Sequence, residues 1–236
     1  MKIEGMKTVL VTGANRGIGL EFVRQYLADH WQVIACCRQP QQAAELQALA
    51  RQFSALQIHA LDVANHARID GLAEELRQES IDVLINNAGV YGDQSGRGFG
   101  SLDYQRWLEV FRINTQGPVK MSEAFLPHVT RSRKKLIIAL SSKMGSIGDN
   151  TSGGCILYRS TKAALNAALK SISIDLRPQG VGVLILHPGW VKTDMGGPNA
   201  LITVEESVSG MRRIIDRFQL PDSGHFLDYT GKLIPW

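Results

Sequence analysis

Short apolar segments alternate with longer amphipathic segments along the chain. Several apolar segments are apolar at nearly every position, which is typical of central strands in a parallel sheet covered by helices on both faces. The amphipathic segments carry apolar residues at helical spacing. The pattern predicts strands over residues 8–11, 32–36, 56–61, 83–85, 136–140, 181–186 and 224–228, and helices over 18–27, 41–52, 65–79, 102–129, 157–176 and 204–218.

This alternation predicts the fold class. We expect an α/β fold of the Rossmann type, with a doubly wound, mainly parallel sheet of about seven strands and helices on both faces. No repeat or linker divides the sequence, so residues 1–236 are expected to form one domain. The least regular stretches, 90–101, 143–154 and 192–203, each follow a strand and should meet at the carboxyl edge of the sheet, where such folds bind ligands.

The composition is that of a soluble globular protein. Hydrophobic residues make up 44% and charged residues 20% of the chain. No apolar run approaches the ~18 residues needed to span a bilayer, and the first residues lack a signal-peptide core, so we expect a cytoplasmic protein without membrane attachment. The three cysteines are too few for a disulfide framework and are expected to be buried thiols.

The charges and histidines argue against two other classes of protein. The net charge of +4 is spread along the chain, and the one compact basic run, residues 131–135, is interpreted as a solvated loop. Without interleaved aromatics or a binding motif, we expect no nucleic-acid partner. The six histidines form no metal-binding spacing and no CxxC pair is present, so no metal site is expected.

A glycine-rich turn follows the first strand and runs into the first helix. Its sequence over residues 12–19 is TGANRGIG, with Gly13, Gly17 and Gly19 in a GxxxGxG spacing. Glycines let the backbone approach a phosphate closely, and the helix N-terminus favours negative charge. We therefore predict a dinucleotide site here, with contacts from Gly13, Asn15, Arg16, Gly17, Ile18 and Gly19.

The end of the second strand indicates which dinucleotide is bound. Many such sites place an acid there to bond the adenosine ribose hydroxyls. Here no acid lies between His30 and Ala44, and Arg38 follows the strand. Arg38 and Arg16 could both face a ribose 2′-phosphate, so NADP(H) is the predicted cofactor; the alternative is that Arg38 only begins a solvated turn.

Tyr158 and Lys162 are the candidate chemical pair. Their i, i+4 spacing places them on one face of a helix. Acid/base work near neutrality would require the pKa of Tyr158 to lie well below its usual value of about 10. A nearby ammonium stabilises phenolate over phenol and could supply part of this, and the oxidised nicotinamide ring would add positive charge on the same side. Upstream, Ser142 follows a strand and could hold a carbonyl oxygen.

Taken together, these motifs resemble those of the short-chain dehydrogenase/reductase family. The resemblance spans roughly residues 7–230. The sequences YRSTKAALN at 158–166 and GKLIPW at 231–236 are most similar to sniffer-like and C-signal-factor-like carbonyl reductases. The motifs that match in order are Thr12-Gly13-x-x-x-Gly17-x-Gly19, Asp62-Val63, Asn86-Asn87-Ala88-Gly89, Asn114, Ser142, Tyr158-x-x-x-Lys162, and Pro188-Gly189 with Thr193.

The resemblance implies roles for the matching residues. Tyr158 would donate a proton to a carbonyl oxygen, Lys162 would activate it and hold the nicotinamide ribose, and Ser142 would orient the carbonyl. Asn114 would hold a water that links Lys162 to solvent; otherwise it is a polar residue near a helix irregularity. The further cofactor contacts implied are Asp62, Val63, Asn87, Ala88, Gly89, Pro188, Gly189, Val191 and Thr193.

The sequence leaves several alternatives open. The spacing from Ser142 to Tyr158 is longer than in most family members, so Ser141 or Ser146 could be the working hydroxyl. Tyr91 and Trp190 could line the pocket or serve packing. The expected function is NADPH-dependent reduction of a small carbonyl substrate by a homodimer or homotetramer. The alternative is a dinucleotide-binding sensor or signalling protein with little turnover.

Overall fold

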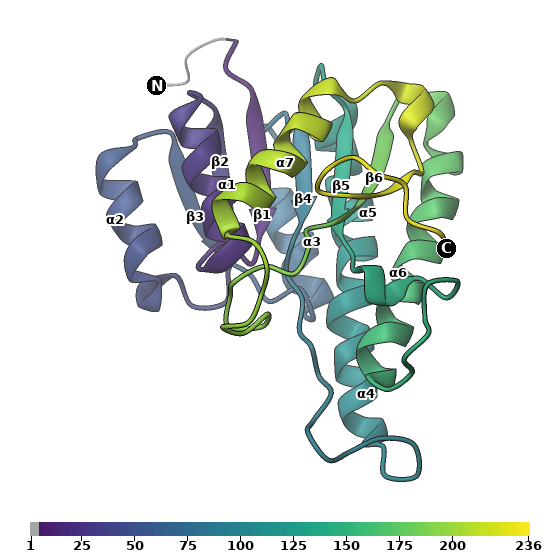
Figure 1. Cartoon of the computed structure of the whole chain (residues 1–236). Helices are drawn as coiled ribbons and strands as arrows, with labels where there is room; N and C mark the ends of the chain where they lie inside the picture. Colours follow the sequence, from purple (N-terminus) through teal and green to yellow (C-terminus); the bar gives the residue numbers. More distant parts are fainter. Residues whose placement is uncertain (1–4) are drawn as a thin grey trace.

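The computed structural model describes residues 5–236 and contains one seven-stranded sheet (Figure 1). All neighbouring strands are parallel, in the order β3-β2-β1-β4-β5-β6-β7. The predicted doubly wound fold is confirmed. The strands are β1 Thr8–Thr12, β2 Gln32–Cys37, β3 Leu56–Ala60, β4 Val83–Asn86, β5 Leu136–Leu140, β6 Gly182–His187 and β7 Phe226–Asp228.

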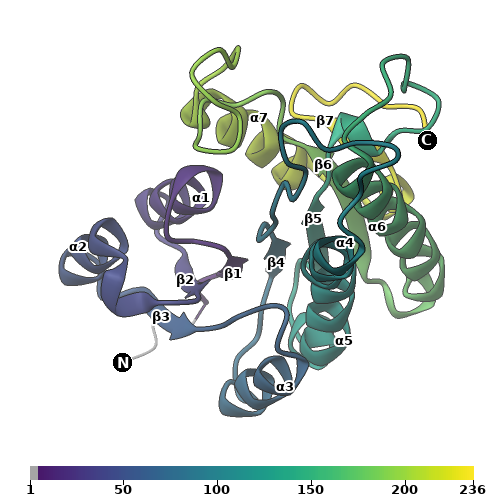
Figure 2. The same cartoon turned by 90° about the horizontal axis from the view of Figure 1, so that it is seen from below.

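Helices cover both faces of the sheet (Figure 2). Helices α1, α2 and α7 lie on one face, and α3, α5 and α6 lie on the other. Each face has its own apolar cluster, because alternate residues of the buried strands point to opposite sides. The α-helices are α1 Gly17–Ala28, α2 Ala44–Gln52, α3 His66–Glu75, α4 Tyr104–Phe111, α5 Gly117–Thr130, α6 Ile156–Asp175 and α7 Val204–Arg217.

The long helix predicted over residues 102–129 is wrong in one respect. The structure divides it into α4 and α5, joined by a π-helical turn over Arg112–Gln116. Pro118 has no N–H to donate to the carbonyl of Asn114, four residues earlier, so a regular α-helix cannot be completed there. The π-helical turn places Asn114 in the interior of the protein.

The sheet edge at β7 is covered by the chain's own C-terminal segment. Leu233 forms an antiparallel bridge with Leu227, and the N–H of Ile234 donates to the carbonyl of Phe226 at 2.9 Å. Ile234 is buried. The edge is therefore paired with an additional stretch of chain.

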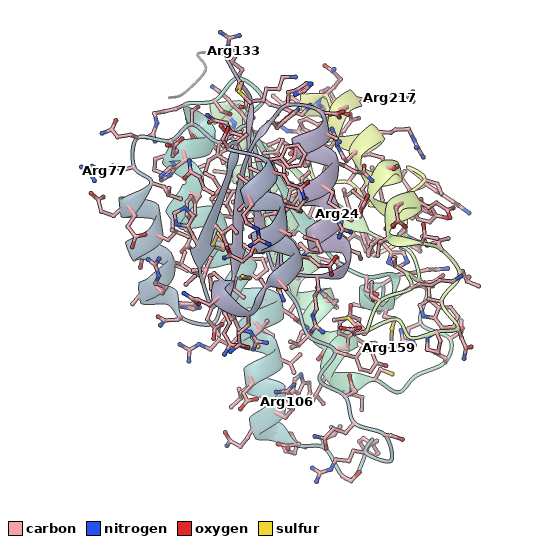
Figure 3. All side chains as sticks on the ribbon, turned by 90° about the vertical axis from the view of Figure 1, so that its left-hand side faces the viewer. Arg24, Arg77, Arg106, Arg133, Arg159 and Arg217 are labelled. Carbon is pink, nitrogen blue, oxygen red and sulfur yellow. The ribbon has the colours of Figure 1, made fainter. Side chains whose placement is uncertain are left out.

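The surface charges are distributed over separate elements. Arg24, Arg77, Arg133 and Arg217 are exposed and project from different parts of the molecule (Figure 3). Within residues 5–236, no helix is long and apolar enough to cross a membrane. The same residues contain no group of three or more His, Cys, Asp or Glu side chains that could hold a metal ion.

Candidate active site

The three irregular stretches gather at one edge of the sheet, as the sequence predicts. In Figure 1 the loops that follow β4, β5 and β6 lie below the strands, at their carboxyl ends. The glycine-rich turn after β1 reaches the same edge. This edge is where a doubly wound sheet binds its ligand.

Three positions require glycine in the turn after β1, two for their backbone conformation and one for a close contact. Gly13 and Gly17 have φ of 63° and 51°, a conformation that side chains disfavour. At Gly19, an added Cβ would lie 2.2 Å from the carbonyl oxygen of Gly13. The start of α1 therefore packs directly on the turn, and any larger residue at position 19 would push them apart.

The segment after β4 holds this turn in place. The side-chain amide of Asn87 donates to the carbonyls of Thr12, at 2.8 Å, and Gly13, at 3.1 Å. In return, the hydroxyl of Thr12 accepts from the main-chain N–H groups of Asn87 and Ala88, both at 3.1 Å. Asn87 thus holds the shape of the glycine-rich turn through its hydrogen bonds with Thr12 and Gly13.

The end of β2 lies beside the glycine turn. The N–H of Ala14 donates to the carbonyl of Cys36 at 3.0 Å. Arg38 follows two residues later and is exposed. The structure therefore places Arg38 at the same edge as the turn, as the proposed role in phosphate binding requires.

The residues after β3 lie on the other side of β2. The N–H of Leu61 donates to the carbonyl of Cys37 at 2.9 Å. Asp62 is exposed and its carboxylate accepts from the N–H of Ala64 at 2.9 Å. Val63 is buried against Gly117, at the start of α5.

Arg16 joins the glycine turn to the loop after β6. Its guanidinium forms an exposed ion pair with Asp194. Close by, an added Cβ at Gly17 would lie 3.3 Å from the methyl group of Thr193. The turn and the loop therefore contact each other, and Arg16 already has a carboxylate partner that a phosphate would have to replace.

The loop after β6 is shaped by its own main chain. Gly189 has a φ of 89°, and Ser207 donates to the carbonyl of Pro188 at 2.5 Å. Val191 is buried and forms an isolated parallel bridge with Ile202. These contacts place Thr193 next to the glycine turn.

Tyr158 and Lys162 lie together in the first turns of α6. Only 9% of Tyr158 and 4% of Lys162 is exposed. The Lys162 ammonium lies 5.8 Å from the centroid of the Tyr158 ring, and it donates to the carbonyl of Leu140 at 2.8 Å. The last residue of β5 therefore anchors the lysine.

The protein on its own does not give Tyr158 the lowered pKa that acid/base work near neutrality would require. Burial raises the pKa of Tyr158 to about 12, while its side-chain hydrogen bond with Ser142 acts in the opposite direction. Burial also lowers the pKa of Lys162 to about 8. Removal from water disfavours the charged form of each group.

The three candidate serines have different partners. Ser142 bonds with Tyr158 and accepts from the N–H of Met144 at 3.1 Å. Ser141 donates to the side-chain oxygen of Asn166 at 2.5 Å. Ser146 donates to the main-chain oxygen of Trp236 at 3.4 Å. Ser142 is therefore the serine that the geometry associates with Tyr158.

Asn114 is fully buried and fixed by its side-chain amide. The oxygen accepts from the N–H of Val90 at 2.9 Å, and the nitrogen donates to the carbonyl of Val90 at 2.8 Å and to Thr161 at 3.1 Å. Gly89 lies between the two candidate groups, since an added Cβ there would be 3.3 Å from the Asn114 oxygen and 3.5 Å from the Lys162 ammonium. Asn114 and Lys162 thus border the same small space.

The structure places Tyr91, which the sequence left open between pocket lining and packing, beside Tyr158, and it adds Asp93, which sequence reasoning did not consider. The ring of Tyr91 packs on that of Tyr158, with 5.0 Å between centroids, and its hydroxyl lies 2.8 Å from the sulfur of Cys155. Asp93 bonds the main chain at Leu157 and Tyr158. No local pattern joins these residues, because more than sixty positions separate them in sequence.

Two further expectations need adjustment. Cys36 and Cys37 are buried as expected, but Cys155 is partly exposed, so the prediction of three buried thiols is wrong for one of them. Trp190 is 51% exposed, and its indole N–H donates to the carbonyl of Gly196 at 2.8 Å. It therefore braces the loop after β6.

Comparison with known proteins identifies the family. A profile of the family described as short chain dehydrogenase matches residues 7–200. The chain belongs to the short chain dehydrogenase family. The predicted family resemblance is confirmed, and the chain is an oxidoreductase of this family.

Three relatives illustrate how far the similarity extends. The C-signal protein of Myxococcus xanthus is 46% identical over 156 residues, which cover 66% of this chain and 93% of that protein. The structure of the carbonyl reductase Sniffer of D. melanogaster matches with a TM-score of 0.92 and 36% identity over 98% of this chain and 100% of that one. An NADPH-bound carbonyl reductase from chicken fatty liver matches with a TM-score of 0.90 and 39% identity, over 98% and 99% of the two chains.

Short chain dehydrogenases bind a nicotinamide dinucleotide, and the turn after β1 fits one. Because positions 13, 17 and 19 are glycines, no side chain at these positions covers the main chain of the turn. Arg16, the residue preceding α1, offers no side-chain cap to that helix. Main-chain N–H groups of the first helical turn therefore lack a side-chain acceptor, which is the arrangement that receives a pyrophosphate.

Proposed function

We propose that this chain is an NADP(H)-dependent carbonyl reductase that converts an aldehyde, ketone or quinone into the alcohol. The observation that carries the proposal is the convergence of Tyr158, Lys162 and Ser142 at the carboxyl edge of the sheet, beside the glycine turn. A dinucleotide-binding protein without chemistry has no need of a buried phenol with a buried ammonium beside its ring.

Tyr158 is the proposed proton donor. Its raised pKa of about 12 keeps the phenol protonated at neutral pH, so the proton is available to a carbonyl oxygen that gains negative charge. Ser142, bonded to the same phenol, is placed to donate a second hydrogen bond to that oxygen. NADPH, when bound, supplies the hydride to the carbonyl carbon.

Lys162 and Asn114 are proposed to renew the proton on Tyr158. Both border the space next to Gly89, and Lys162 lies beneath the Tyr158 ring. The α-helical donor for the main-chain carbonyl of Asn114 is missing at Pro118. A water bonded at Asn114 would connect Lys162 to solvent, and the lysine would also hold the nicotinamide ribose.

The preference for NADP(H) over NAD(H) rests on the end of β2. Arg38 is exposed beside the glycine turn, and no acid lies between His30 and Ala44 to repel a 2′-phosphate. Arg16 is the second candidate for binding the 2′-phosphate, which would replace Asp194 as the partner of its guanidinium. The chicken relative is an NADPH-bound carbonyl reductase, which supports the same preference.

The remaining cofactor contacts follow the edge of the sheet. We propose that Asp62 and Val63 contact the adenine, that Asn87, Ala88 and Gly89 line the middle of the site, and that Thr193 holds the nicotinamide carboxamide after the turn at Pro188, Gly189 and Val191. The whole of residues 1–236 is proposed to act as one dinucleotide-binding domain.

The test is the consumption of NADPH with a panel of aldehydes, ketones, quinones and β-ketoacyl thioesters. We expect at least one class to give stoichiometric alcohol or hydroquinone, and slower turnover with NADH. Binding of NADPH without reduction of any member of the panel would contradict the proposal.

A second candidate function is a cofactor-dependent signalling role. It is favoured by the 46% identity to a protein named C-signal. It predicts tight NADPH binding, little turnover, and a protein partner whose affinity differs between the NADPH-bound and NADP⁺-bound forms. A pull-down performed with each cofactor form in turn distinguishes this role from the reductase.

A further inference from the structure

The carboxylate of Asp93 lies at the N-terminus of α6. One oxygen accepts from the N–H of Leu157 at 3.1 Å and the other from the N–H of Tyr158 at 2.8 Å. These are the second and third residues of α6, whose N–H groups have no partner within the helix. A negative charge at this end is also favoured by the helix dipole.

The helix has no local residue that could do the same. Cys155 precedes α6 in a left-handed conformation, with φ of 48° and ψ of 44°, and its side chain makes no capping bond. Its thiol instead lies 2.8 Å from the hydroxyl of Tyr91. The cap therefore comes from a residue more than sixty positions earlier in the chain.

The loop that carries Asp93 is itself fixed. Both main-chain groups of Val90 are bonded to the side chain of Asn114. At Gly92, φ is 81° and an added Cβ would lie 2.2 Å from a methyl group of Val110, so the loop lies directly on α4. Residues 90–93 thus connect the π-helical turn, through Asn114, to the start of α6, through Asp93.

We propose that Asp93 is a positioning residue for carbonyl reduction. By holding the main-chain N–H of Tyr158 from outside the helix, it fixes the place of the phenol relative to the substrate and to Ser142. This inference rests on the proposed function, because it assigns Asp93 a part in the reaction of Tyr158. A displacement of about 1 Å at a reacting group can lower a rate by about 100-fold.

The experiment compares Asp93→Ala and Asp93→Asn with a matched control, Asn65→Ala. Asn65 caps α3, a helix that carries none of Ser142, Tyr158 and Lys162, by accepting from the N–H of Arg68 at 3.1 Å. We expect Asp93→Ala to lower kcat by about tenfold or more while the Kd for NADPH changes by less than about twofold. Asp93→Asn offers one acceptor oxygen in place of two and should be intermediate.

The control separates positioning from simple helix capping. Asn65→Ala should lose thermal stability, as an uncapped helix does, with kcat unchanged. If Asp93→Ala loses stability to the same extent but retains wild-type kcat, Asp93 has only a structural role and the proposal is overturned. Equal kcat for Asp93→Asn and Asp93→Ala would also contradict it, since one restored bond should recover part of the rate.

Parallel assays of the wild type and Tyr158→Phe distinguish failure of this inference from failure of the proposed function. A wild type that reduces no carbonyl, or an active Tyr158→Phe, overturns the function, and the positioning role with it. An active wild type with an inactive Tyr158→Phe leaves the Asp93 variants to decide this inference alone. Amide exchange at Leu157 and Tyr158 reports the cap itself in either case, and exchange unchanged in Asp93→Ala would overturn the proposal.

Discussion

Burial acts on Tyr158 and Lys162 in opposite directions. The phenol has a raised pKa and the ammonium a lowered one, each because burial disfavours its charged state. The protein alone therefore keeps the tyrosine as an acid, ready for reduction. For the reverse reaction, we expect the oxidised nicotinamide to supply part of the positive charge that would stabilise a phenolate.

The burial of Lys162 predicts a cost in stability. Its pKa of about 8, against an ordinary 10.5, corresponds to about 3 kcal/mol of destabilisation while the lysine is charged. A substitution that removes the ammonium also removes its hydrogen bond to Leu140, which offsets part of the expected gain in stability. At pH 7 we expect Lys162→Met to raise the free energy of unfolding by about 1 to 2 kcal/mol while lowering kcat, as measured by urea unfolding and NADPH consumption.

The lowered pKa of Lys162 also determines how the free energy of unfolding changes with pH. Between pH 8 and 10.5 the unfolded chain binds the lysine proton and the folded protein does not, so wild-type stability gains with rising pH over this window. The advantage of Lys162→Met should therefore shrink between pH 7 and pH 10. An advantage that stays constant would show that Lys162 is not buried in its charged form.

Substitution of Arg38 tests the proposed preference for NADPH over NADH. A charge-assisted contact contributes about 1.5 to 3 kcal/mol, so Arg38→Asp should lower the NADPH:NADH ratio of kcat/KM by about tenfold or more. Arg133→Asp is the control, because Arg133 is also exposed but precedes β5, whereas Arg38 follows β2, so the two lie at opposite edges of the parallel sheet. An unchanged ratio in Arg38→Asp would mean that Arg38 only begins a solvated turn.

At the level of residues, the sequence was informative where chemistry and spacing coincide. Tyr158 and Lys162 are four positions apart on one helix, so their contact followed from the helical repeat. The choice among Ser141, Ser142 and Ser146 needed the structure, because the path of a long loop decides which hydroxyl faces the tyrosine. Asp93 carried no signal at all, since its partners are main-chain N–H groups.

At the level of elements, the C-terminal segment links the sheet edge to the active-site loop. Trp236 stacks on Phe226 with 5.8 Å between ring centroids. Its main-chain oxygen accepts from the N–H of Gly148, at 2.7 Å, and from Ser146. The segment thereby holds the loop that runs from Ser142 to Tyr158.

A pair of neighbouring substitutions tests this link. Ile234 is 8% exposed and Leu233 is 62% exposed. We expect Ile234→Ala to lower the free energy of unfolding by about 2 to 4 kcal/mol, since it leaves a cavity, and Leu233→Ala to change it by less than about 0.5 kcal/mol. Equal effects in urea unfolding would show that the segment is not packed against the sheet.

Most elements were predictable because burial of the strands makes them continuously apolar. The strands of the sheet were each placed within one or two residues of their observed ends. An irregularity near Asn114 was considered, but its π-helical form was not predicted, because the apolar spacing continues smoothly through it. The signal that could have revealed it is Gly117-Pro118, where a missing N–H interrupts the helical bonding.

At the level of the whole molecule, the order of the motifs made the fold predictable. The glycine turn, the asparagine segment and the tyrosine helix lie far apart in sequence, and the parallel sheet brings their ends to one edge. The long-range contacts at this edge, such as those of Arg16 with Asp194 and Tyr91 with Tyr158, depend on loop paths that no periodicity encodes.

Self-association is a further expectation for the whole molecule. From the family resemblance we expect a homodimer or homotetramer that pairs through the helices of the asparagine and tyrosine segments. Tyr104 and Leu108 lie four residues apart on α4 and are both more than 60% exposed. Sedimentation should give twice or four times the mass of one chain, and Leu108→Glu should lower it. A wild type that sediments as one chain would contradict this expectation.

The most direct test of the account is the turnover of Tyr158→Phe, measured with NADPH and the best carbonyl substrate. Tyr104→Phe, which alters an exposed tyrosine on α4, is the matched control. The account predicts that Tyr158→Phe loses kcat by about 100-fold or more, in line with the contribution of a general acid, while its Kd for NADPH stays within about twofold of the wild type. Wild-type kcat in Tyr158→Phe would contradict the assignment of Tyr158 as the proton donor.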